Sequence, residues 1–192
     1  MLSQWNFNNS YLQLPKIFFS KTKPNQFSNL ELILKNQKLI DKLSLDRTKF
    51  DKFIVTSIAD DKQDFYSQAY AGHQFGHFTI LGDGRATLLG EHLNKESERF
   101  DIQLKGSGKT PYSRNGDGKG TLKSMLREYI VSEAMYNLNI KTTRSLAVLK
   151  TGEKIIRNSF EEGGILVRVA TSHIRVGTFQ LAALSEERKN IE

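Results

Sequence analysis

Two glycine-rich segments with basic neighbours contain the residues best suited to hold a phosphate. The first is Gly82-Asp83-Gly84-Arg85, and the second, Gly106-Ser107-Gly108, follows directly after Lys105. Glycine allows positive φ and a close backbone approach, so glycines beside cationic side chains suit a phosphate-binding cradle. Either segment alone is more simply explained as a tight hairpin turn. The phosphate hypothesis therefore depends on their combination with a third segment, Gly116-Asp117-Gly118, and with the charged residues around them.

Lys105 ends an alternating segment, residues 100–105, that predicts a β-strand. The apolar residues of this segment share one face of the strand. Lys105 lies on the opposite face with Asp101 and Gln103. We therefore expect the lysine to point towards a cleft or solvent.

The clearest helix in the sequence is predicted over residues 121–138, with Asn139 as its stop. This helix carries two acids, Glu128 and Glu133, that could pair with Lys105. Their positions on a helical wheel do not decide which acid faces the lysine. For either one, a solvated or capping glutamate is the simpler alternative.

Two arginines near the end of the chain are further candidates for anion binding. Arg168 lies on a predicted strand, residues 165–170, on the face opposite Val167 and Val169, and Arg175 follows seven residues later. An arginine on a strand face costs stability unless it finds an anion or a carboxylate.

The remaining elements are predicted from periodicity and turn residues. We expect a helix over residues 30–45, and a strand or an acid-ended turn over residues 50–59. We expect one hairpin of residues 78–81 with 86–93, and another of residues 145–149 with 154–156 around Thr151-Gly152.

Two other segments resemble known motifs but lack residues or a conformation that those motifs require. Gly108-Lys109-Thr110 lacks the earlier glycine of a Walker A motif, since that position holds Gln103, and Pro111 follows immediately. His73 and His77 have the spacing of a helical metal site, but the glycines around them disfavour a helix. We interpret the two histidines as polar packing in a loop, and predict no metal ligand in this chain.

The composition is that of a globular protein with a core of ordinary size, since 38% of its 192 residues are hydrophobic. Its net charge of +7 comes from 28 basic and 21 acidic residues scattered along the chain, which is typical of a solvated surface. There is no cysteine, which excludes disulfides and cysteine metal sites. No secretory signal or membrane span is visible, so we expect a cytoplasmic protein.

Taken together, these elements have the order of a protein-kinase small lobe: glycine segment, strand lysine, helix glutamate, hairpin and final strand. In that lobe the lysine contacts nucleotide phosphates and the helix glutamate holds the lysine. The sequence therefore predicts an α+β fold, with an antiparallel sheet and a packed helix, that binds ATP.

Several uncommon strings, found in order between about residues 65 and 180, resemble those of the selenoprotein O family, also called YdiU. They are Tyr70-Ala71-Gly72-His73-Gln74-Phe75-Gly76, Leu81-Gly82-Asp83-Gly84-Arg85, Leu104-Lys105-Gly106-Ser107-Gly108, Thr110-Pro111-Tyr112-Ser113-Arg114, Asp117-Gly118, Arg127-Glu128, Ser132-Glu133-Ala134-Met135, Thr142-Thr143-Arg144 and Arg168-Val169-Ala170. That family is similar in fold to protein kinases. It transfers AMP from ATP to protein hydroxyls, with the nucleotide bound in the reverse sense.

The resemblance implies a nucleotide-binding set formed by Gly82, Gly84, Arg85, Lys105, Asp117, Gly118, Arg168 and Arg175. Within it, Lys105 would contact phosphate and pair with Glu128. Arg168 and Arg175 would hold the outer phosphates, which leaves the α-phosphorus open to an incoming hydroxyl.

The resemblance also implies a division of the chain and a missing part. Residues 1–65 would be an N-terminal extension, residues 66–180 the kinase-like small lobe, and residues 181–192 the start of a truncated large lobe. The catalytic base and the ligands of Mg²⁺ or Mn²⁺ would lie beyond Glu192. The chain alone is then expected to be inactive.

Two other classes of function stay open at this point. The chain could be a non-catalytic ATP-binding or interaction module. The two hypotheses differ in whether a longer reading frame supplies the catalytic and metal-binding acids. A basic nucleic-acid binder would show binding that weakens steeply with salt. The sequence lacks the aromatic platform or clustered basic face that such binding needs. We therefore expect ATP and substrate proteins as partners, and neither nucleic acid nor a membrane.

Overall fold

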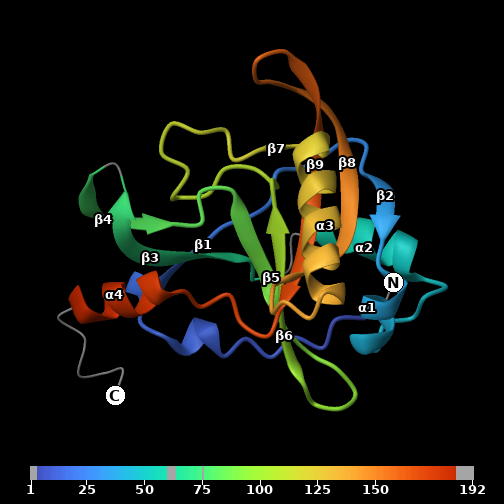
Figure 1. The fold of residues 1–192 in the computed structure, drawn as a ribbon, viewed down its shortest axis with the longest axis horizontal. Helices are drawn as coiled ribbons and strands as arrows, with labels where there is room; N and C mark the ends of the chain where they lie inside the picture. Colours follow the sequence, from blue (N-terminus) through green and yellow to red (C-terminus); the bar gives the residue numbers. More distant parts are fainter. Residues whose placement is uncertain (1–3, 60–63, 75, 185–192) are drawn as a thin grey trace.

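One antiparallel sheet forms the centre of the structure, a computed structural model that describes residues 4–59, 64–74 and 76–184. Its strands are β1 (Phe19–Lys21), β2 (Glu31–Lys35), β3 (Tyr66–Gln74), β4 (His77–Gly82), β5 (Ala86–Leu93), β6 (Arg99–Lys105), β7 (Gly120–Thr121), β8 (Arg144–Ile156) and β9 (Phe160–Ala170). Within the described residues they pair in the order β1-β3-β5-β6-β9-β8-β2, with β4 on β3 and β7 on β9 (Figure 1).

The helices are α1 (Gln37–Lys42), α2 (Phe50–Ala59), α3 (Leu122–Asn137) and α4 (Val176–Leu184), with short 3₁₀ turns at Tyr11–Gln13 and Lys16–Phe18. This arrangement confirms the predicted α+β class. It also confirms an antiparallel sheet over residues 78–170 with the helix near residues 121–138 packed on it. The more specific likeness to a kinase small lobe stays a prediction.

The sheet buries its two faces differently. On one face, α1, α2 and Trp5 form the main core with side chains of β6, β8 and β9, including Ile102 and Leu104. On the other face, Met125 of α3 is fully buried against Val148 and Leu166. Because strand side chains alternate, the polar residues of β6 lie on the same face as α3. That face holds the candidate site.

Local signals fix the ends of α3. The hydroxyl of Thr121 accepts a hydrogen bond from the backbone N–H of Ser124 at 3.1 Å, which caps the first turn. Leu138 is the C-cap, and Asn139 follows with a φ of 60°. Asparagine tolerates this left-handed conformation better than most residues, so the predicted stop is confirmed.

Two predictions near the N-terminus are wrong. Residues 30–45 form β2 and then α1, because the side chain of Asn36 accepts a hydrogen bond from Leu39 N–H at 3.1 Å and starts the helix there. Residues 50–59 form α2 rather than a strand or turn. Its buried residues recur at the helical spacing that the sequence interpretation overlooked: Phe50, Phe53, Ile54 and Ile58.

Both predicted hairpins are also wrong. The first predicted hairpin is replaced by one between β3 and β4, in which the chain reverses between Gln74 and His77. β4 and β5 both pair with β3 rather than with each other, and residues 82–85 connect them. β8 continues through Thr151-Gly152, where the register shifts, and its turn to β9 lies at residues 157–159. A glycine with positive φ, such as Gly152 at 75°, serves a bulge as well as a turn.

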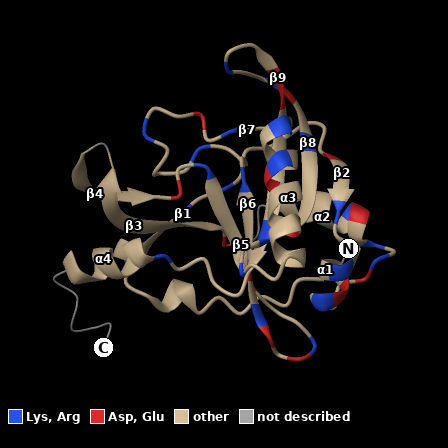
Figure 2. Cartoon of the chain, in the orientation of Figure 1, with Lys and Arg blue, Asp and Glu red and all other residues tan. Residues whose placement is uncertain are grey.

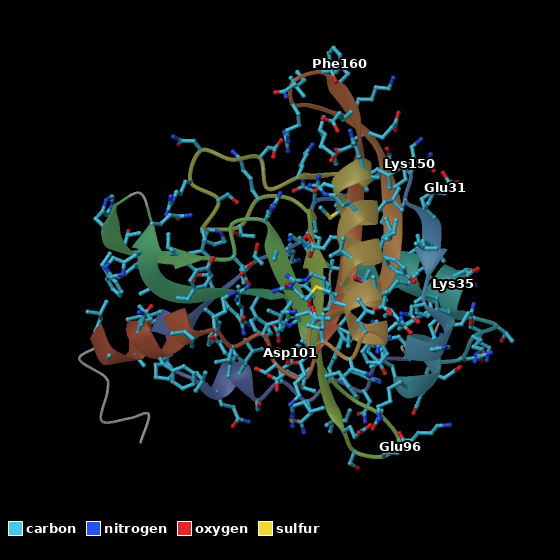
Figure 3. The ribbon with its side chains drawn as sticks, in the orientation of Figure 1. Glu31, Lys35, Glu96, Asp101, Lys150 and Phe160 are labelled. Atoms are coloured by element: carbon cyan, nitrogen blue, oxygen red, sulfur yellow. The ribbon has the colours of Figure 1, made fainter. Side chains whose placement is uncertain are left out.

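Charge and hydrophobicity are unevenly distributed over these elements. Strands β3 and β4 and helix α4 carry no Lys, Arg, Asp or Glu, whereas basic and acidic residues are interspersed elsewhere in the view of Figure 2. Phe160, at the projecting end of the β8–β9 hairpin, is 73% exposed (Figure 3). None of the helices in the described residues is long and apolar enough to cross a membrane.

The first 65 residues take part in the same sheet as the rest of the chain. β1 pairs with β3, and β2 pairs with β8 at the opposite edge. The boundary predicted at residue 65 stays a prediction.

Candidate functional site

The candidate site is built on the polar face of β6. Asp101, Gln103 and Lys105 alternate along this strand, as the sequence predicts. Gln103 has no exposed surface, Asp101 is 6% exposed, and the Lys105 side chain is 20% exposed. Buried polar groups need partners, so each of these residues determines which side chains lie around it.

Lys105 forms an ion pair with α3. Its Nζ lies 2.5 Å from Oε2 of Glu128, and the other carboxylate oxygen of Glu128 lies 3.4 Å from Nε of Arg168. Burial lowers the pKa of Arg168, and the charge of Glu128 opposes that shift. An arginine stays protonated even so. One glutamate therefore holds two cations from neighbouring strands.

The second acid of α3 has a different partner. Both carboxylate oxygens of Glu133 accept hydrogen bonds from Arg144, at 2.9 and 2.7 Å, and the carboxylate also accepts from Asn36 and from the Ser145 N–H. Glu133 therefore ties α3 to the start of β8 and to the cap of α1. The structure pairs Lys105 with Glu128, as the resemblance implies.

Arg175 reaches the same region from the segment that follows β9. Its Nη2 lies 2.8 Å from Oδ1 of Asp83, and its Nη1 donates to Gln68 and to the carbonyl of His173. Asp83 is 5% exposed. Burial raises the pKa of Asp83, and the charge of Arg175 opposes that shift. The guanidinium also lies over the ring of Tyr70, 4.8 Å from its centroid.

Asp101 anchors the segment that carries Arg175. Its Oδ2 accepts a hydrogen bond from the backbone N–H of His173 at 2.6 Å and lies 3.4 Å from Nδ1 of the same residue. Burial lowers the pKa of His173, so the imidazole is neutral at pH 7.

The first glycine segment is fixed by residues 110–113. The carbonyl of Asp83 accepts a hydrogen bond from Thr110 Oγ1 at 2.7 Å, and the carbonyl of Gly84 accepts one from Ser113 Oγ at 2.5 Å. A Cβ on Gly84 would lie 2.9 Å from the carbonyl oxygen of Tyr112, and one on Gly82 would overlap the ring of that tyrosine. This close packing explains the two glycines without a ligand, and Arg85 beside them is exposed.

The third glycine segment lies against the second. Gly118 has a φ of +68°, and a Cβ there would overlap the carbonyl of Gly108. Asp117 forms an ion pair with Arg157 at 2.8 Å and accepts from the Lys119 N–H. The hydrogen bond from the guanidinium of Arg157 lowers the pKa of Asp117. Among the described residues, Asp117 therefore contacts Arg157 of the β8–β9 turn and its own neighbour Lys119, and not Arg168 or Arg175.

The structure thus brings four predicted residues into one network: Lys105, Glu128, Arg168 and Arg175. Sequence reasoning assigned no site role to Gln103 and Asp83, which connect the arginines. The alternation of β6 placed Gln103 on the correct face, but nothing local identified its partners. Gly82, Gly84, Arg85, Asp117 and Gly118 lie in the glycine segments, and their predicted contact with a nucleotide stays a prediction.

No group of three or more His, Cys, Asp or Glu side chains that could hold a metal occurs in the described part of the chain. His73 and His77 lie on the β3–β4 hairpin, where the ring of His73 meets the ring of Phe78 edge-on at 5.1 Å. Within the ranges that the structure describes, the side chains do not form a site for Mg²⁺ or Mn²⁺ by themselves.

The family model described as protein adenylyltransferase SelO matches residues 1–192. The chain belongs to the SelO family. Three relatives, each named protein nucleotidyltransferase YdiU, are similar to it. The protein of Pelagibacter ubique (strain HTCC1062) is 51% identical, over 98% of this chain and 40% of its own length. Those of Clostridium perfringens (strain ATCC 13124) and Brevibacillus brevis (strain 47) are 55% and 56% identical, over 93% of this chain and 38% of their own lengths.

These matches confirm the resemblance to the selenoprotein O or YdiU family. The chain spans about two fifths of the length of these SelO-family relatives and corresponds to an N-terminal part of them. Protein adenylyltransferase and nucleotidyltransferase are the activities that the family and its members are named for.

The position of Glu133 generates a prediction on stability. Burial raises its pKa, but the hydrogen bonds from Arg144 and Ser145 and the charge of Arg144 outweigh burial, so the pKa is lowered overall. Glu133→Gln should reduce the free energy of unfolding at pH 7 by about 1–3 kcal/mol, because it weakens a charge-assisted network.

The sign of the pH dependence follows from the lowered pKa. The stabilisation is present above the unfolded pKa of about 4.3 and is lost as the pH falls through the folded pKa. Urea denaturation between pH 7 and pH 3.5 should therefore show a shrinking difference between wild type and Glu133→Gln. Glu96→Gln, at an exposed position, is the control. A difference that stays constant with pH would contradict the assignment.

Proposed function

We propose that the chain is the nucleotide-binding part of a protein adenylyltransferase that transfers AMP from ATP to the hydroxyls of Ser, Thr or Tyr in proteins. The observation that carries this proposal is the cluster of Lys105, Arg168 and Arg175 on one face of the sheet. Each cation is held by a carboxylate, Glu128 or Asp83, that leaves further donors on the cation.

The cluster suits the phosphates of a nucleotide. Each of the three cations keeps N–H donors beyond its carboxylate contact, and charge-assisted hydrogen bonds to phosphate oxygens are stronger than neutral ones. Arginine presents donors in a planar fork that matches phosphate geometry, while the compact ammonium of lysine acts as a point charge. If the two arginines bind the terminal phosphates, the α-phosphorus is the one left for an incoming hydroxyl.

In this proposal, the metal ligands and the catalytic base lie in the part of the longer relatives that this chain does not cover. Mg²⁺ or Mn²⁺ bound to the triphosphate would neutralise its charge. The described residues do not form a cluster for such an ion. We propose that its ligands and the catalytic base lie beyond the residue equivalent to Glu192 in full-length relatives.

Three substitutions test the phosphate contacts. Lys105→Met, Arg168→Ala and Arg175→Ala should each weaken ATP binding by about 1.5–3 kcal/mol, which is about tenfold to a hundredfold in affinity, because each removes a charge-assisted contact. Isothermal titration calorimetry of the chain with ATP measures the effect. Lys49→Met, which replaces a 67% exposed lysine, is the matched control. Unchanged affinity in all three variants would assign these residues a structural role only.

Labelled ATP separates adenylyl transfer from phosphoryl transfer. A full-length relative, such as the Pelagibacter ubique protein, should transfer the α-label to protein and release pyrophosphate, leaving the γ-label in solution. The 192-residue chain should transfer neither label, because it lacks the proposed base and metal ligands. Transfer of the γ-label by the full-length relative would contradict adenylyl transfer. Label transfer by the short chain would place catalytic acids within it, with Asp83, Asp101 and Asp117 the first to substitute.

A further inference from the structure

Gln103 connects the two arginines of the site. It lies on β6 directly opposite Arg168 of β9, and its side chain has no exposed surface. Its Oε1 accepts a hydrogen bond from Arg168 Nη1 at 3.0 Å, and its Nε2 donates to Asp83 Oδ2 at 3.2 Å. Oδ1 of Asp83 accepts from Arg175 Nη2 at 2.8 Å. The path from Arg168 to Arg175 is therefore continuous through one amide and one carboxylate.

An amide is the group that this position requires. Arg168 can only donate and Asp83, when ionised, can only accept, so the residue between them must accept on one side and donate on the other. A carboxylate at position 103 would face Asp83 with like charge, and an aliphatic side chain would remove the partner of Arg168 Nη1 and of Asp83 Oδ2. No other uncharged side chain of the same length provides both an acceptor and a donor in this way.

We propose that Gln103 is a positioning residue, which holds Arg168 and Arg175 in one mutual orientation so that both guanidinium groups meet the phosphate chain of the nucleotide. This inference rests on the proposed function. Gln103 is too deeply buried to contact the ligand and acts through the arginines. A guanidinium that is already fixed loses less conformational freedom when an anion binds, so its contact contributes more affinity.

The contacts of the two arginines support this role. Arg168 also donates from Nη2 to Thr143 at 3.3 Å, and Arg175 donates from Nη1 to Gln68 and to the carbonyl of His173. A guanidinium has five N–H donors, so these contacts orient both groups and leave donors for an anion.

Two substitutions distinguish positioning from simple packing. Gln103→Leu removes the acceptor and the donor at every pH. Gln103→Glu keeps an acceptor for Arg168 but places a carboxyl group beside Asp83. Two carboxyl groups in contact share a proton, which raises the pKa of one of them. Below that pKa the protonated carboxyl can donate to Asp83 and accept from Arg168, as the amide does.

The charged and titratable groups near this position come from several elements: Asp101 and Lys105 on β6, Asp83 before β5, Glu128 on α3, Arg168 on β9, and His173 and Arg175 after β9. They are present in wild type and in both variants. Affinities are therefore compared with wild type at each pH, which also cancels the titration of ATP itself.

Calorimetry with ATP from pH 8 to pH 5.5 is the test. Gln103→Leu should bind about tenfold or more weakly than wild type at every pH, because two contacts of the network are lost. Gln103→Glu should bind as weakly at pH 8 and recover towards wild type as the pH falls. Gln37→Leu, at an exposed position on α1, should bind like wild type. Wild-type affinity in both Gln103 variants would overturn the proposal.

A second readout does not depend on ATP. The Nε–H signals of Arg168 and Arg175 in ¹⁵N NMR should be sharp and dispersed in wild type and should broaden or move to the free-arginine position in Gln103→Leu. Thermal unfolding shows that the variant is folded. Unchanged arginine signals would overturn the role of Gln103, even if ATP binds. Altered arginine signals in a chain that shows no ATP binding would support the positioning and contradict the proposed function.

Discussion

The burial of a polar strand face is the constraint on which the rest of the site depends. β6 lies near the middle of the sheet with both faces covered, and one face carries Asp101, Gln103 and Lys105. Each of these groups would cost free energy without a partner. Asp101 accepts a hydrogen bond from the backbone after β9, and Lys105 pairs with the glutamate of α3. Gln103 contacts both the arginine of β9 and the aspartate before β5. The contacts that satisfy the buried polar side chains of β6 therefore assemble the site.

The same network explains how three cations can be close together without a ligand. Glu128 lies between Lys105 and Arg168, and Asp83 lies against Arg175, so each cation has a carboxylate partner in the folded chain. Removing one partner from such a buried set leaves an uncompensated charge, which is more costly than the pair was favourable. The carboxylates thus stabilise the fold, while the cations keep N–H donors that an anion can accept from.

Periodicity predicted the elements that carry the site but not the contacts between them. The alternation in β6 and β9 and the apolar spacing of α3 are local properties, so Lys105, Arg168 and the helix could be placed from sequence. The choice between Glu128 and Glu133 depends on how α3 lies on the sheet, which a helical wheel does not contain. The two hairpin predictions were wrong because a glycine with positive φ fits a bulge or a connection as well as a turn. Gln103 and Asp83 are 20 residues apart in the sequence. Strand pairing that no local pattern specifies brings their side chains into contact.

The orientation of the nucleotide is the most direct test of the proposed function. A crystal structure of the chain with a non-hydrolysable ATP analogue would show which phosphates meet Arg168 and Arg175. The proposed function predicts that the terminal phosphates contact both guanidinium groups, with the α-phosphate further out and open to an incoming hydroxyl. An adenine ring at the arginines, or an analogue bound away from Lys105 and both arginines, would contradict it.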